Sequence, residues 1–409
     1  MKHKVQLFLF LSLVMGMMSS CEKNQTNADN PIKIISLTES EQTKSMQGND
    51  FALRFLNQIE QEKSIAGSYL LSPLSLQLTL SMLLEGADGT TLSQIAQVLG
   101  YGIEEIDALR SYSEKLLREL PKLDNCVQFA LAQALIHSHP ILDSYKADVS
   151  RYYEAELYPL NAGKGDLVKQ INRWCSEKTG GQIKQLFSQD ELHSTVAAIL
   201  LQALSFKGAW QFPFDKKMTT RESFFPENGA QKEVDMMKIE KQFHRFRGAS
   251  YSGISIPFGN TAFSMQILLP DKGVEIKEIT RQIAANGVVK PETFTHSTSL
   301  WIPRYETQTT IKLNDLLKKM GIKDAFDSGC ANFSKMSGEK IFLDIVKQST
   351  AIKVNEDGAE SSAATGAVLT YTGTTPINDK DMHLDRTFLY LIRENSTGAI
   401  LFFGKYDGD

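Results

Sequence analysis

The residues of this chain that could bind a metal or attack a substrate are few and scattered. The nearest pair of potential metal ligands is His137 and His139, whose side chains would share one face of a β-strand. Because no third ligand follows nearby, we interpret both as structural histidines and expect neither a metal nor another cofactor. Cys126, Cys175 and Cys330 match no zinc-binding spacing. We expect buried thiols, although an exported protein could form one disulfide.

The chain also lacks the sequence motifs of the common enzyme classes. It contains no G-x-S-x-G, H-E-x-x-H, C-x-x-C or P-loop motif. Gly86 and Gly89 follow an apolar helical pattern at Leu76 to Leu84, and they fit a helix end and a turn rather than a phosphate-binding loop. We therefore expect a protein that is not an enzyme.

A long segment of small and polar residues stands out near the C-terminus. From Gly358 to Asp381 the residues Ala, Ser, Thr and Gly predominate, without helical periodicity, between two strong strand patterns. Loops of this length are uncommon inside a compact domain and are often functional. Alternate positions are uncharged and mostly small, which would let them face a core if the loop became a strand, while Glu360 pointed to water. The alternating set is Ala359, Ser361, Ala363, Thr365, Ala367, Leu369 and Tyr371.

Motifs along the chain resemble those of the serpins, a family of protease inhibitors that are consumed in the reaction. The segment from Glu356 to Thr365 resembles the hinge of the serpin reactive-centre loop. Each block alone is weak, but the collinear set is specific and covers about residues 45–409. The further blocks are Ser72–Ser75 with Gly86–Thr90, Ile171–Trp174 with Thr179–Ile183, Phe206–Trp210, Ile256–Asn260, Met265–Pro270, Ile302–Arg304, Gly321–Phe326 and Phe388–Gly404.

The resemblance implies an α+β fold with three β-sheets, about eight or nine helices and an exposed reactive-centre loop at about residues 356–383. The composition, 42% apolar and 22% charged, is typical of a globular protein. No linker, charge run or internal repeat divides residues 45–409. We expect one serpin-like domain and a monomer.

In serpins, a serine protease attacks the loop, and the freed N-terminal limb then inserts into the central sheet and distorts the trapped acyl-enzyme. Rapid insertion needs small, uncharged residues at the first inward-facing positions, and Ala359, Ser361 and Ala363 meet that need. The resemblance therefore implies a suicide-type inhibitor of serine proteases. It assigns nine residues to the loop hinge: Glu356, Gly358, Ala359, Glu360, Ser361, Ser362, Ala363, Ala364 and Thr365.

The family's usual loop length, counted forward from Gly358, places the scissile bond between Thr372 and Gly373. A count back from the following strand gives a bond several residues later, but the inserted limb must fit the sheet, so we prefer the forward count. Thr372 would suit an elastase-like protease, whereas a bond between Tyr371 and Thr372 would suit a chymotrypsin-like one. Between the hinge and Asp379 there is no Lys or Arg, which argues against trypsin-like targets. Papain-like cysteine proteases also form acyl intermediates and are further candidates.

The resemblance also places a set of residues where serpins control the opening of the central sheet, with an ion pair between Arg304 and Glu356. The family usually has Asn at the position of Gln202 and His at that of Gln348. Because Gln can both donate and accept hydrogen bonds, we expect these two residues to form a different hydrogen-bond network at the same place. The departures leave open how easily the sheet opens and whether opening depends on pH. The set is Ser72, Ser75, Gln202, Trp210, Arg304 and Gln348.

The N-terminus predicts export and a lipid anchor. An apolar run, Val5–Met18, follows a positively charged start and is typical of a secretory signal. Two serines then precede Cys21, an arrangement that resembles a bacterial lipoprotein box; the alternative is an ordinary signal peptide that contains a cysteine. We expect residues 1–20 to be removed, Cys21 to be lipidated and residues 21–44 to form a flexible tether. The protein would then lie in a bacterial cell envelope, at the outer membrane, or outside the cell.

Net charge argues against nucleic-acid binding, and the loop hinge distinguishes an inhibitor from a non-inhibitory relative. Loss of Lys2 and Lys4 with the signal moves the formal net charge from −4 to −6, and no basic cluster with interleaved aromatic residues is present, so we expect no nucleic-acid binding. The alternative to an inhibitor is a non-inhibitory serpin that acts as a binding protein or a protease substrate. A charged or bulky residue at Ala359 would have favoured that alternative. An enzyme ranks third.

Overall fold

The computed structural model describes residues 30–160, 164–191, 197–293, 295–359 and 381–409. Within these ranges it contains eight α-helices and fifteen β-strands. The helices are α1 (Glu39–Glu62), α2 (Pro73–Gly86), α3 (Gly89–Leu99), α4 (Ile106–Glu119), α5 (Asp143–Tyr153), α6 (Lys164–Lys178), α7 (Ile276–Asn286) and α8 (Asn314–Met320). The strands are β1 (Tyr69–Leu71), β2 (Val127–His137), β3 (Glu156–Pro159), β4 (Ala198–Ala209), β5 (Thr220–Phe224), β6 (Lys232–Arg247), β7 (Tyr251–Pro257), β8 (Phe263–Pro270), β9 (Thr295–Pro303), β10 (Tyr305–Lys312), β11 (Ile345–Asn355), β12 (Gly358–Ala359), β13 (Asp381–His383), β14 (Phe388–Glu394) and β15 (Ile400–Tyr406).

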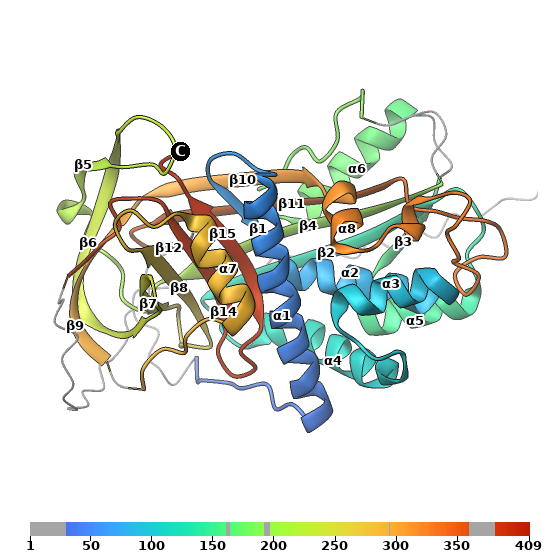
Figure 1. Cartoon of the computed structure of the whole chain (residues 1–409), viewed down its shortest axis with the longest axis horizontal. Coiled ribbons are helices and arrows are strands. Elements are labelled where there is room, and N and C mark those ends of the chain that lie inside the picture. Colours follow the sequence, from blue (N-terminus) through green and yellow to red (C-terminus); the bar gives the residue numbers. More distant parts are fainter. Residues whose placement is uncertain (1–29, 161–163, 192–196, 294, 360–380) are drawn as a thin grey trace, which may run out of the picture.

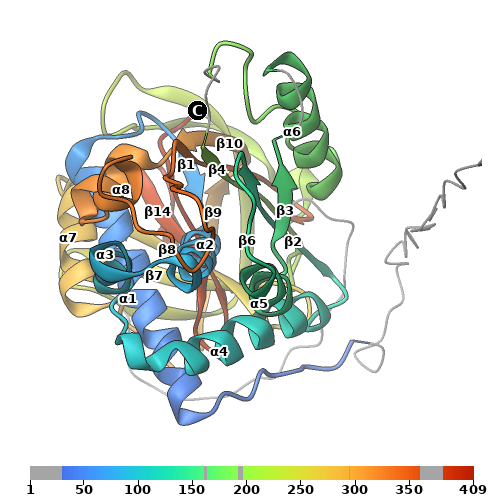
Figure 2. The same cartoon turned by 90° about the vertical axis from the view of Figure 1, so that its right-hand side faces the viewer.

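A six-stranded sheet runs along the long axis of the molecule (Figure 1). Its strand order is β10-β11-β12-β4-β2-β3, and β11 also pairs directly with β4. Both faces of this sheet are covered, α2 lying on one side and α6 on the other (Figure 2). The side chains of β4 alternate accordingly: Leu200 and Leu204 join the main core with α2, whereas Ile199 and Leu201 join a second apolar cluster under α6. A strand buried on both faces explains the apolar sequence of β4.

Helix α2 lies behind the six-stranded sheet, and all of its residues are buried. Ser72 is its N-cap, because the side-chain oxygen accepts a hydrogen bond from the backbone N–H of Ser75, and Pro73 occupies the first helical position. The helix ends at Gly86, as the sequence predicted, and α3 begins at Gly89. This helix carries Ser72 and Ser75 to the back of the sheet.

The second sheet has nine strands, in the order β1-β15-β14-β8-β7-β6-β9-β13, with β5 paired to β6. Strand β6 joins its two parts, since residues 236–244 pair with β9 and residues 244–247 pair with β7. This continuity is why the three sheets expected from the sequence appear here as two hydrogen-bonded sheets. The expected α+β class is confirmed.

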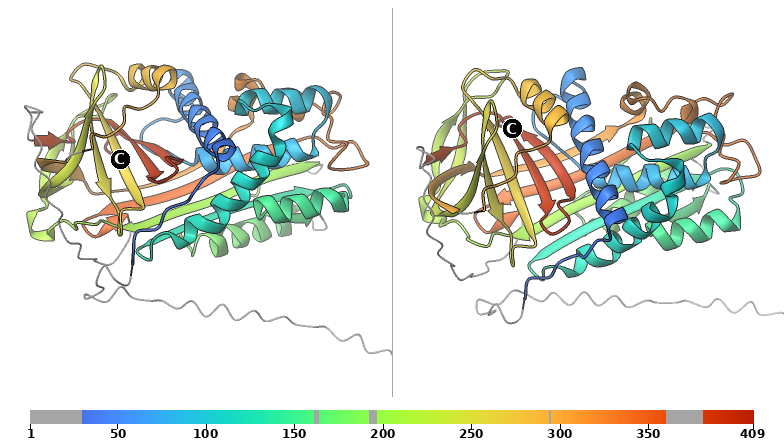
Figure 3. Two further views of the ribbon diagram at one scale, coloured as in Figure 1. Left: turned by 90° about the horizontal axis from the view of Figure 1, so that it is seen from below. Right: turned by 60° about the horizontal axis from the view of Figure 1, so that its bottom comes forward.

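The folded body begins earlier than the sequence predicted. Residues 30–38 lie along the body before α1 (Figure 3), and Asn30 donates a hydrogen bond to Asp124 over 2.8 Å. Ile35 is buried, and Thr38 and Glu41 form a capping box at the start of α1. The interpretation of residues 21–44 as a flexible tether is therefore wrong for residues 30–44, because apolar burial and helix capping attach them.

Two sequence interpretations of isolated side chains also need correction. Strand β2 ends at His137, whose Nδ1 lies 2.7 Å from the carbonyl oxygen of His139, so the two histidines do not share a strand face. Cys175 is buried, and burial raises the pKa of its thiol to about 12. Cys126 is half-buried, and Cys330 is exposed in a turn where Asp327 accepts its backbone N–H. Among the described residues none of the three forms a disulfide, and only Cys175 is the buried thiol that we expected.

Within the described residue ranges, no group of three or more His, Cys, Asp or Glu side chains could hold a metal ion. None of the helices in the same ranges is both long and apolar enough to span a membrane.

Candidate functional site

The candidate site is the line along which β4 and β11 face each other, which we call the seam. In the lower seam the two strands pair directly and in parallel, Ile199–Ser205 with Ile345–Ala351. In the upper seam they diverge, and β12 lies between them. The site therefore contains a closed part and a part that already holds an added strand.

Strand β12 is antiparallel to both neighbours. Gly358 lies opposite Asn355 of β11 and Ala209 of β4, and Ala359 lies opposite Val354 and Gly208. The φ angle of Gly358 is +153°, and a Cβ atom there would come within 2.1 Å of the carbonyl oxygen of Gly208. Only glycine fits this approach of two backbones.

Ala359 is fully buried, at 0% exposure, and is part of the main apolar core. Its methyl group is the first side chain of the loop to enter the seam. A charged side chain at this position would have to lose its hydration. The structure thus places this predicted hinge residue inside the sheet.

The turn before β12 is attached to the segment that follows β4. The indole N–H of Trp210 donates to the carbonyl oxygen of Asn355 over 2.9 Å, and the Trp210 ring stacks on Phe258 with 4.6 Å between centroids. The side-chain oxygen of Asn355 accepts the backbone N–H groups of Asp357 and Gly358. Lys216 pairs with Asp357 at 2.7 Å. The entry of the loop is therefore fixed by several polar contacts.

Glu356 forms the centre of an ion pair at the upper seam. Its side chain is buried, and it accepts hydrogen bonds from the Arg304 guanidinium and from the Thr219 hydroxyl. Arg304 also lies 3.5 Å from Asp235. Burial raises the pKa of Glu356, but the hydrogen bonds from Arg304 and Thr219 outweigh burial and hold this pKa below its usual range. The structure thus contains the ion pair that the resemblance implied.

Neutral glutamines occupy the lower seam. Gln348 of β11 and Gln202 of β4 lie directly opposite each other, and the Gln348 amide donates to the Gln202 side-chain oxygen. Gln348 also accepts the backbone N–H of Ser72 over 2.8 Å and donates to the Ser72 carbonyl oxygen over 3.0 Å. The Ser72 hydroxyl donates to the carbonyl oxygen of Leu401. One side chain therefore connects both strands of the seam to the start of α2.

This buried network is not fully satisfied. Within the described part of the chain, the Gln202 side-chain nitrogen and the Ser75 hydroxyl have no hydrogen-bond partner. A buried polar group without a partner costs about 1–3 kcal/mol. The closed lower seam thus contains polar groups that a new neighbour could satisfy.

A third buried glutamine lies beside Gln202 and Gln348 on the next strand of the sheet, and it was not predicted from the sequence. Gln133 of β2 lies opposite Gln202, is buried, and bonds to the Thr79 hydroxyl of α2 and to the Tyr153 carbonyl oxygen. The signal was present, because Gln133 interrupts the inward-facing apolar set of β2 that contains Leu131 and Leu135.

The outer face of the lower seam is covered by residues 183–191, which follow α6. Phe187 belongs to the apolar cluster under α6, and the Lys347 ammonium of β11 lies 4.3 Å from its ring centroid. Lys347 also pairs with Glu191 at 2.5 Å. The cover therefore extends from β2 and β4, under α6, to β11 on the other side of the seam. Sequence patterns could not predict this contact, because it joins segments that are far apart in the chain.

Several predicted site residues lie outside the described residues. They are the hinge residues Glu360, Ser361, Ser362, Ala363, Ala364 and Thr365, the bond residues Tyr371, Thr372 and Gly373, and Cys21. The described residues bring together the others in two groups. Glu356, Gly358, Ala359, Trp210 and Arg304 lie at the upper seam, and Ser72, Ser75, Gln202 and Gln348 lie at the lower seam.

Comparisons with known proteins agree with this geometry. A sequence profile of the serpin family, described as serine protease inhibitors, matches residues 46–407. The chain is 28% identical to serpin B10 of Rattus norvegicus over 389 residues, covering 88% of this chain and 97% of that protein. It is 29% identical to leukocyte elastase inhibitor A of Mus musculus over 370 residues, covering 87% of this chain and 96% of the relative.

A solved structure gives the same fold. The native state of tengpin, a thermophilic serpin, superposes with a TM-score of 0.79 at 24% identity, covering 92% of this chain and 96% of tengpin. The profile match over most of the chain defines the class of protein. The chain belongs to the serpin family.

Proposed function

We propose that this protein inhibits serine proteases by inserting its cleaved loop along the seam. The observation that carries the proposal is the pairing of β12 on both sides, with Ala359 already inside the core. Insertion would lengthen a strand that has already started. The protein itself would catalyse no reaction, in keeping with a family of inhibitors.

The register of β12 supports a specific inserted state. If the strand continued in the same register, Thr365 would lie between Gln348 and Gln202, and Leu369 would lie opposite Ala198 at the end of β4. The Thr365 hydroxyl could then act as donor and acceptor for the two amides that the opening separates. Its side chain would share the inward face with Ala359, as would every alternate residue between them.

The register also supports the position of the scissile bond. A limb that fills the seam to Leu369 leaves only three residues before a bond between Thr372 and Gly373. In the reaction, the protease serine oxygen would bond to the Thr372 carbonyl carbon, and the bond to the Gly373 nitrogen would break. The new amine would leave with the C-terminal fragment, and the ester would remain on the inserted limb.

The energy for trapping would come from exchanging one strand pairing for two. Opening the lower seam breaks a parallel pairing of seven residue pairs. Insertion replaces it with antiparallel pairings on both sides, which gain on the order of 10 kcal/mol at about 1 kcal/mol per hydrogen bond. That release is comparable to the whole free energy of unfolding of a typical domain, about 5–15 kcal/mol, so it could distort a protease active site.

The proposed targets are elastase-like proteases, because Thr372 offers a small β-branched side chain. The likeness to leukocyte elastase inhibitor A favours the same class of target. Cleavage after Tyr371 would direct the protein to chymotrypsin-like enzymes instead, and papain-like cysteine proteases are further candidates.

The proposed setting is a bacterial cell envelope or the space outside it, with a monomer held to a membrane by lipid on Cys21. The observation behind this proposal is the lipoprotein-like sequence before Cys21. Replacing this cysteine, Cys21→Ser, should abolish incorporation of a labelled fatty acid in cells and release the protein from membranes. Labelling that persists in the variant would exclude Cys21 as the lipid site.

Incubation of the mature protein with a panel of proteases tests the proposal. The panel contains pancreatic elastase, neutrophil elastase, chymotrypsin, cathepsin G and trypsin, and products are separated on denaturing gels. We expect a covalent complex with the elastases and a released peptide that begins at Gly373. A peptide that begins at Thr372 would move specificity to Tyr371. Cleavage without a complex would overturn inhibition and favour a non-inhibitory serpin.

A further inference from the structure

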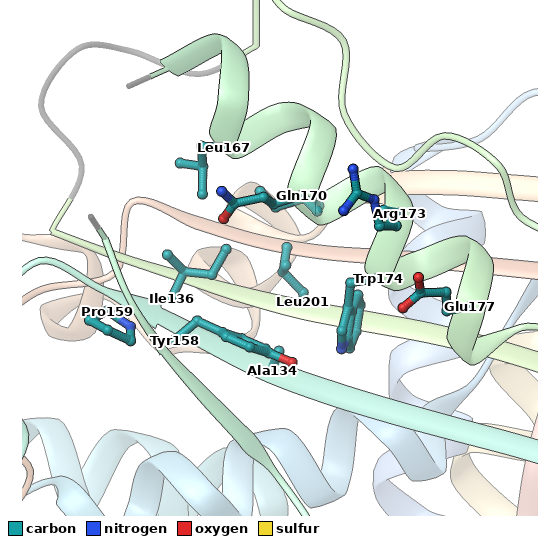
Figure 4. Close-up of a pocket in the computed structure, with 11 residues that line it drawn as sticks. Ala134, Ile136, Tyr158, Pro159, Leu167, Gln170, Arg173, Trp174, Glu177 and Leu201 are labelled. Carbon is teal, nitrogen blue, oxygen red and sulfur yellow. The ribbon is translucent and has the colours of Figure 1, made fainter. Parts of the chain in front are cut away.

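A cavity of about 260 Å³ lies between α6 and the strands below it (Figure 4). It lies on the outer face of the six-stranded sheet, over β2 and β3, and it reaches β4 at Leu201. Its floor and roof are apolar, and the side chains that form them are buried. The floor is formed by Ala134, Ile136 and Leu201, and the roof by Leu167, Ile171 and Trp174.

The small side chain of Ala134 helps to explain the cavity. The other floor and roof residues are large, so the helix is held above the strand at this point. The roof residues recur along α6 at intervals of four and three residues, which places them on one face of the helix. The result is a slot between the sheet and one helix, lined by apolar side chains on both sides, which suits an apolar ring.

Two aromatic side chains at the slot are fixed by one carboxylate. The indole N–H of Trp174 donates to Glu156 over 3.3 Å, and the Tyr158 hydroxyl also hydrogen-bonds to Glu156. Lys178 pairs with the same carboxylate at 2.5 Å. Tyr158 is nevertheless 41% exposed, which is high for an aromatic side chain that lines a cavity. The mouth of the cavity is therefore preformed and aromatic.

The rim of the cavity carries polar side chains of α6, namely Gln170, Arg173 and Glu177 (Figure 4). Arg173 and Glu177 have the four-residue spacing of a helical ion pair. Within the described residues, however, the structure records no ion pair or side-chain hydrogen bond for either of them. The guanidinium of Arg173 and the amide of Gln170 therefore remain available as adjacent N–H donors at the mouth.

We propose that this cavity binds a small, flat aromatic carboxylate of one or two fused rings. The ring would lie between the apolar floor and roof, and the carboxylate would meet Arg173, whose planar donors match a carboxylate. The size is adequate, since a cavity of about 150 Å³ already admits benzene. The proposal does not rest on protease inhibition, because no lining residue is one of the predicted hinge, bond or sheet-opening residues; Leu201 alone belongs to a strand of the seam.

Direct binding of three naphthalene derivatives to the full chain tests the proposal. The probes are 2-naphthoate, 2-naphthylmethanol and 2-naphthylmethylamine, measured by calorimetry and by tryptophan fluorescence. We expect saturable binding of one molecule, with 2-naphthoate the tightest. Arg173→Gln should weaken 2-naphthoate about fivefold to tenfold and change 2-naphthylmethanol less than twofold. Ala134→Leu, which fills the slot, should weaken both at least tenfold.

Two controls keep the result interpretable. Arg281→Gln removes an exposed arginine of α7 that pairs with Glu278, and it should leave all three affinities unchanged. Trp174→Phe should keep the calorimetric affinity for 2-naphthoate within about threefold of the wild-type value, but it should abolish the quenching of tryptophan fluorescence by the bound probe. This control is informative even if Ala134→Leu fails to fold. No saturable binding, equal binding of the three probes, or the tightest binding by the amine would overturn the proposal.

Discussion

The upper and lower halves of the seam are built from different interactions. In the upper seam, β12 lies between the strands, and the ion pair of Arg304 with Glu356 and the indole of Trp210 fix its approach. In the lower seam, β4 and β11 pair directly, and a neutral contact between Gln348 and Gln202 joins them. Charged groups thus fix the open half, whereas neutral amides join the two strands of the closed half beneath the Lys347–Glu191 pair on its outer face.

Under the proposed mechanism, this difference separates the place where insertion would start from the barrier that it would have to cross. The upper seam can admit small residues without further opening, because its strands have already diverged. The lower seam must lose seven residue pairs, and it is covered by α2 on one face and by residues 183–191 on the other. Changes in the upper seam should therefore alter whether the loop enters, and changes in the lower seam should alter how easily the sheet opens.

The strongest test of the upper seam is Ala359→Arg. Burial of an arginine without a partner among Val354 and Gly208 would cost several kcal/mol, so insertion should become slower than hydrolysis of the acyl-enzyme. We expect the yield of covalent complex with elastase to fall at least tenfold while loop cleavage continues. Densitometry of denaturing gels measures both products.

Ala359→Ser is the matched control, because serine is small and uncharged and is already used at alternate positions of the loop. Its complex yield should stay within twofold of the wild-type protein. An arginine variant that still traps elastase at the wild-type yield would show that entry of Ala359 is not required.

The next largest effect should come from Gln348→Ala in the lower seam. The substitution leaves the Ser72 N–H and the Gln202 side-chain oxygen without a partner and removes one of the two hydrogen bonds to the Ser72 carbonyl oxygen, which should lower the free energy of unfolding by about 2–4 kcal/mol. Chemical denaturation of the intact protein measures this loss. The cleaved, inserted form should lose less, because the opening has already broken the direct contact between Gln348 and Gln202.

Gln308→Ala provides the comparison on the neighbouring strand β10, where the side chain is exposed. It should change the free energy of unfolding by less than about 0.5 kcal/mol. Equal losses in the intact and cleaved forms of Gln348→Ala would mean that the glutamine contact does not distinguish the closed sheet from the open one.

The two halves also differ in how far the sequence could predict them. The small residues around Ala359, the glycine at 358 and the pairing of Arg304 with Glu356 follow from local pattern and family resemblance. The lower seam depends on which side chains meet across three strands and a helix. The role of Gln133 and the unpaired side-chain nitrogen of Gln202 could therefore not be predicted from sequence spacing. The contact of Phe187 with Lys347 and the packing of residues 30–38 likewise depend on tertiary structure.

The ion pair at the upper seam should make the protein sensitive to acid. Because the pKa of Glu356 is lowered in the folded state, its carboxylate stabilises the fold above a pH of about 4.5, and this contribution is lost as the pH falls through the folded-state pKa. Arg304 is 41% exposed, so we expect a contribution of only about 1 kcal/mol. Glu356→Gln should remove this part of the pH dependence of unfolding, measured from about pH 6 to pH 3.

Glu306→Gln is the control for the acid test, because Glu306 is largely exposed and lies 3.7 Å from Lys353 on the same sheet. The pH dependence of this variant should match that of the wild-type protein. If Glu356→Gln also retains the full dependence, other carboxylates must govern the acid response.

The smallest expected effect concerns the cover over the lower seam. Lys347 is almost fully buried, and its partner Glu191 is 45% exposed, so Glu191→Gln should destabilise the cover by about 0.5 kcal/mol. The limiting rate of complex formation at saturating protease should then rise about twofold, because residues 183–191 must leave the seam before the limb can fill it. Added salt should produce a similar rise in the wild-type protein and little change in the variant.

Glu177→Gln is the control, because it removes an acidic side chain of α6 away from the seam and should leave the rate unchanged. A rate that is unchanged or lower in Glu191→Gln would mean that the cover is not part of the barrier, which would then lie in the glutamine contact alone.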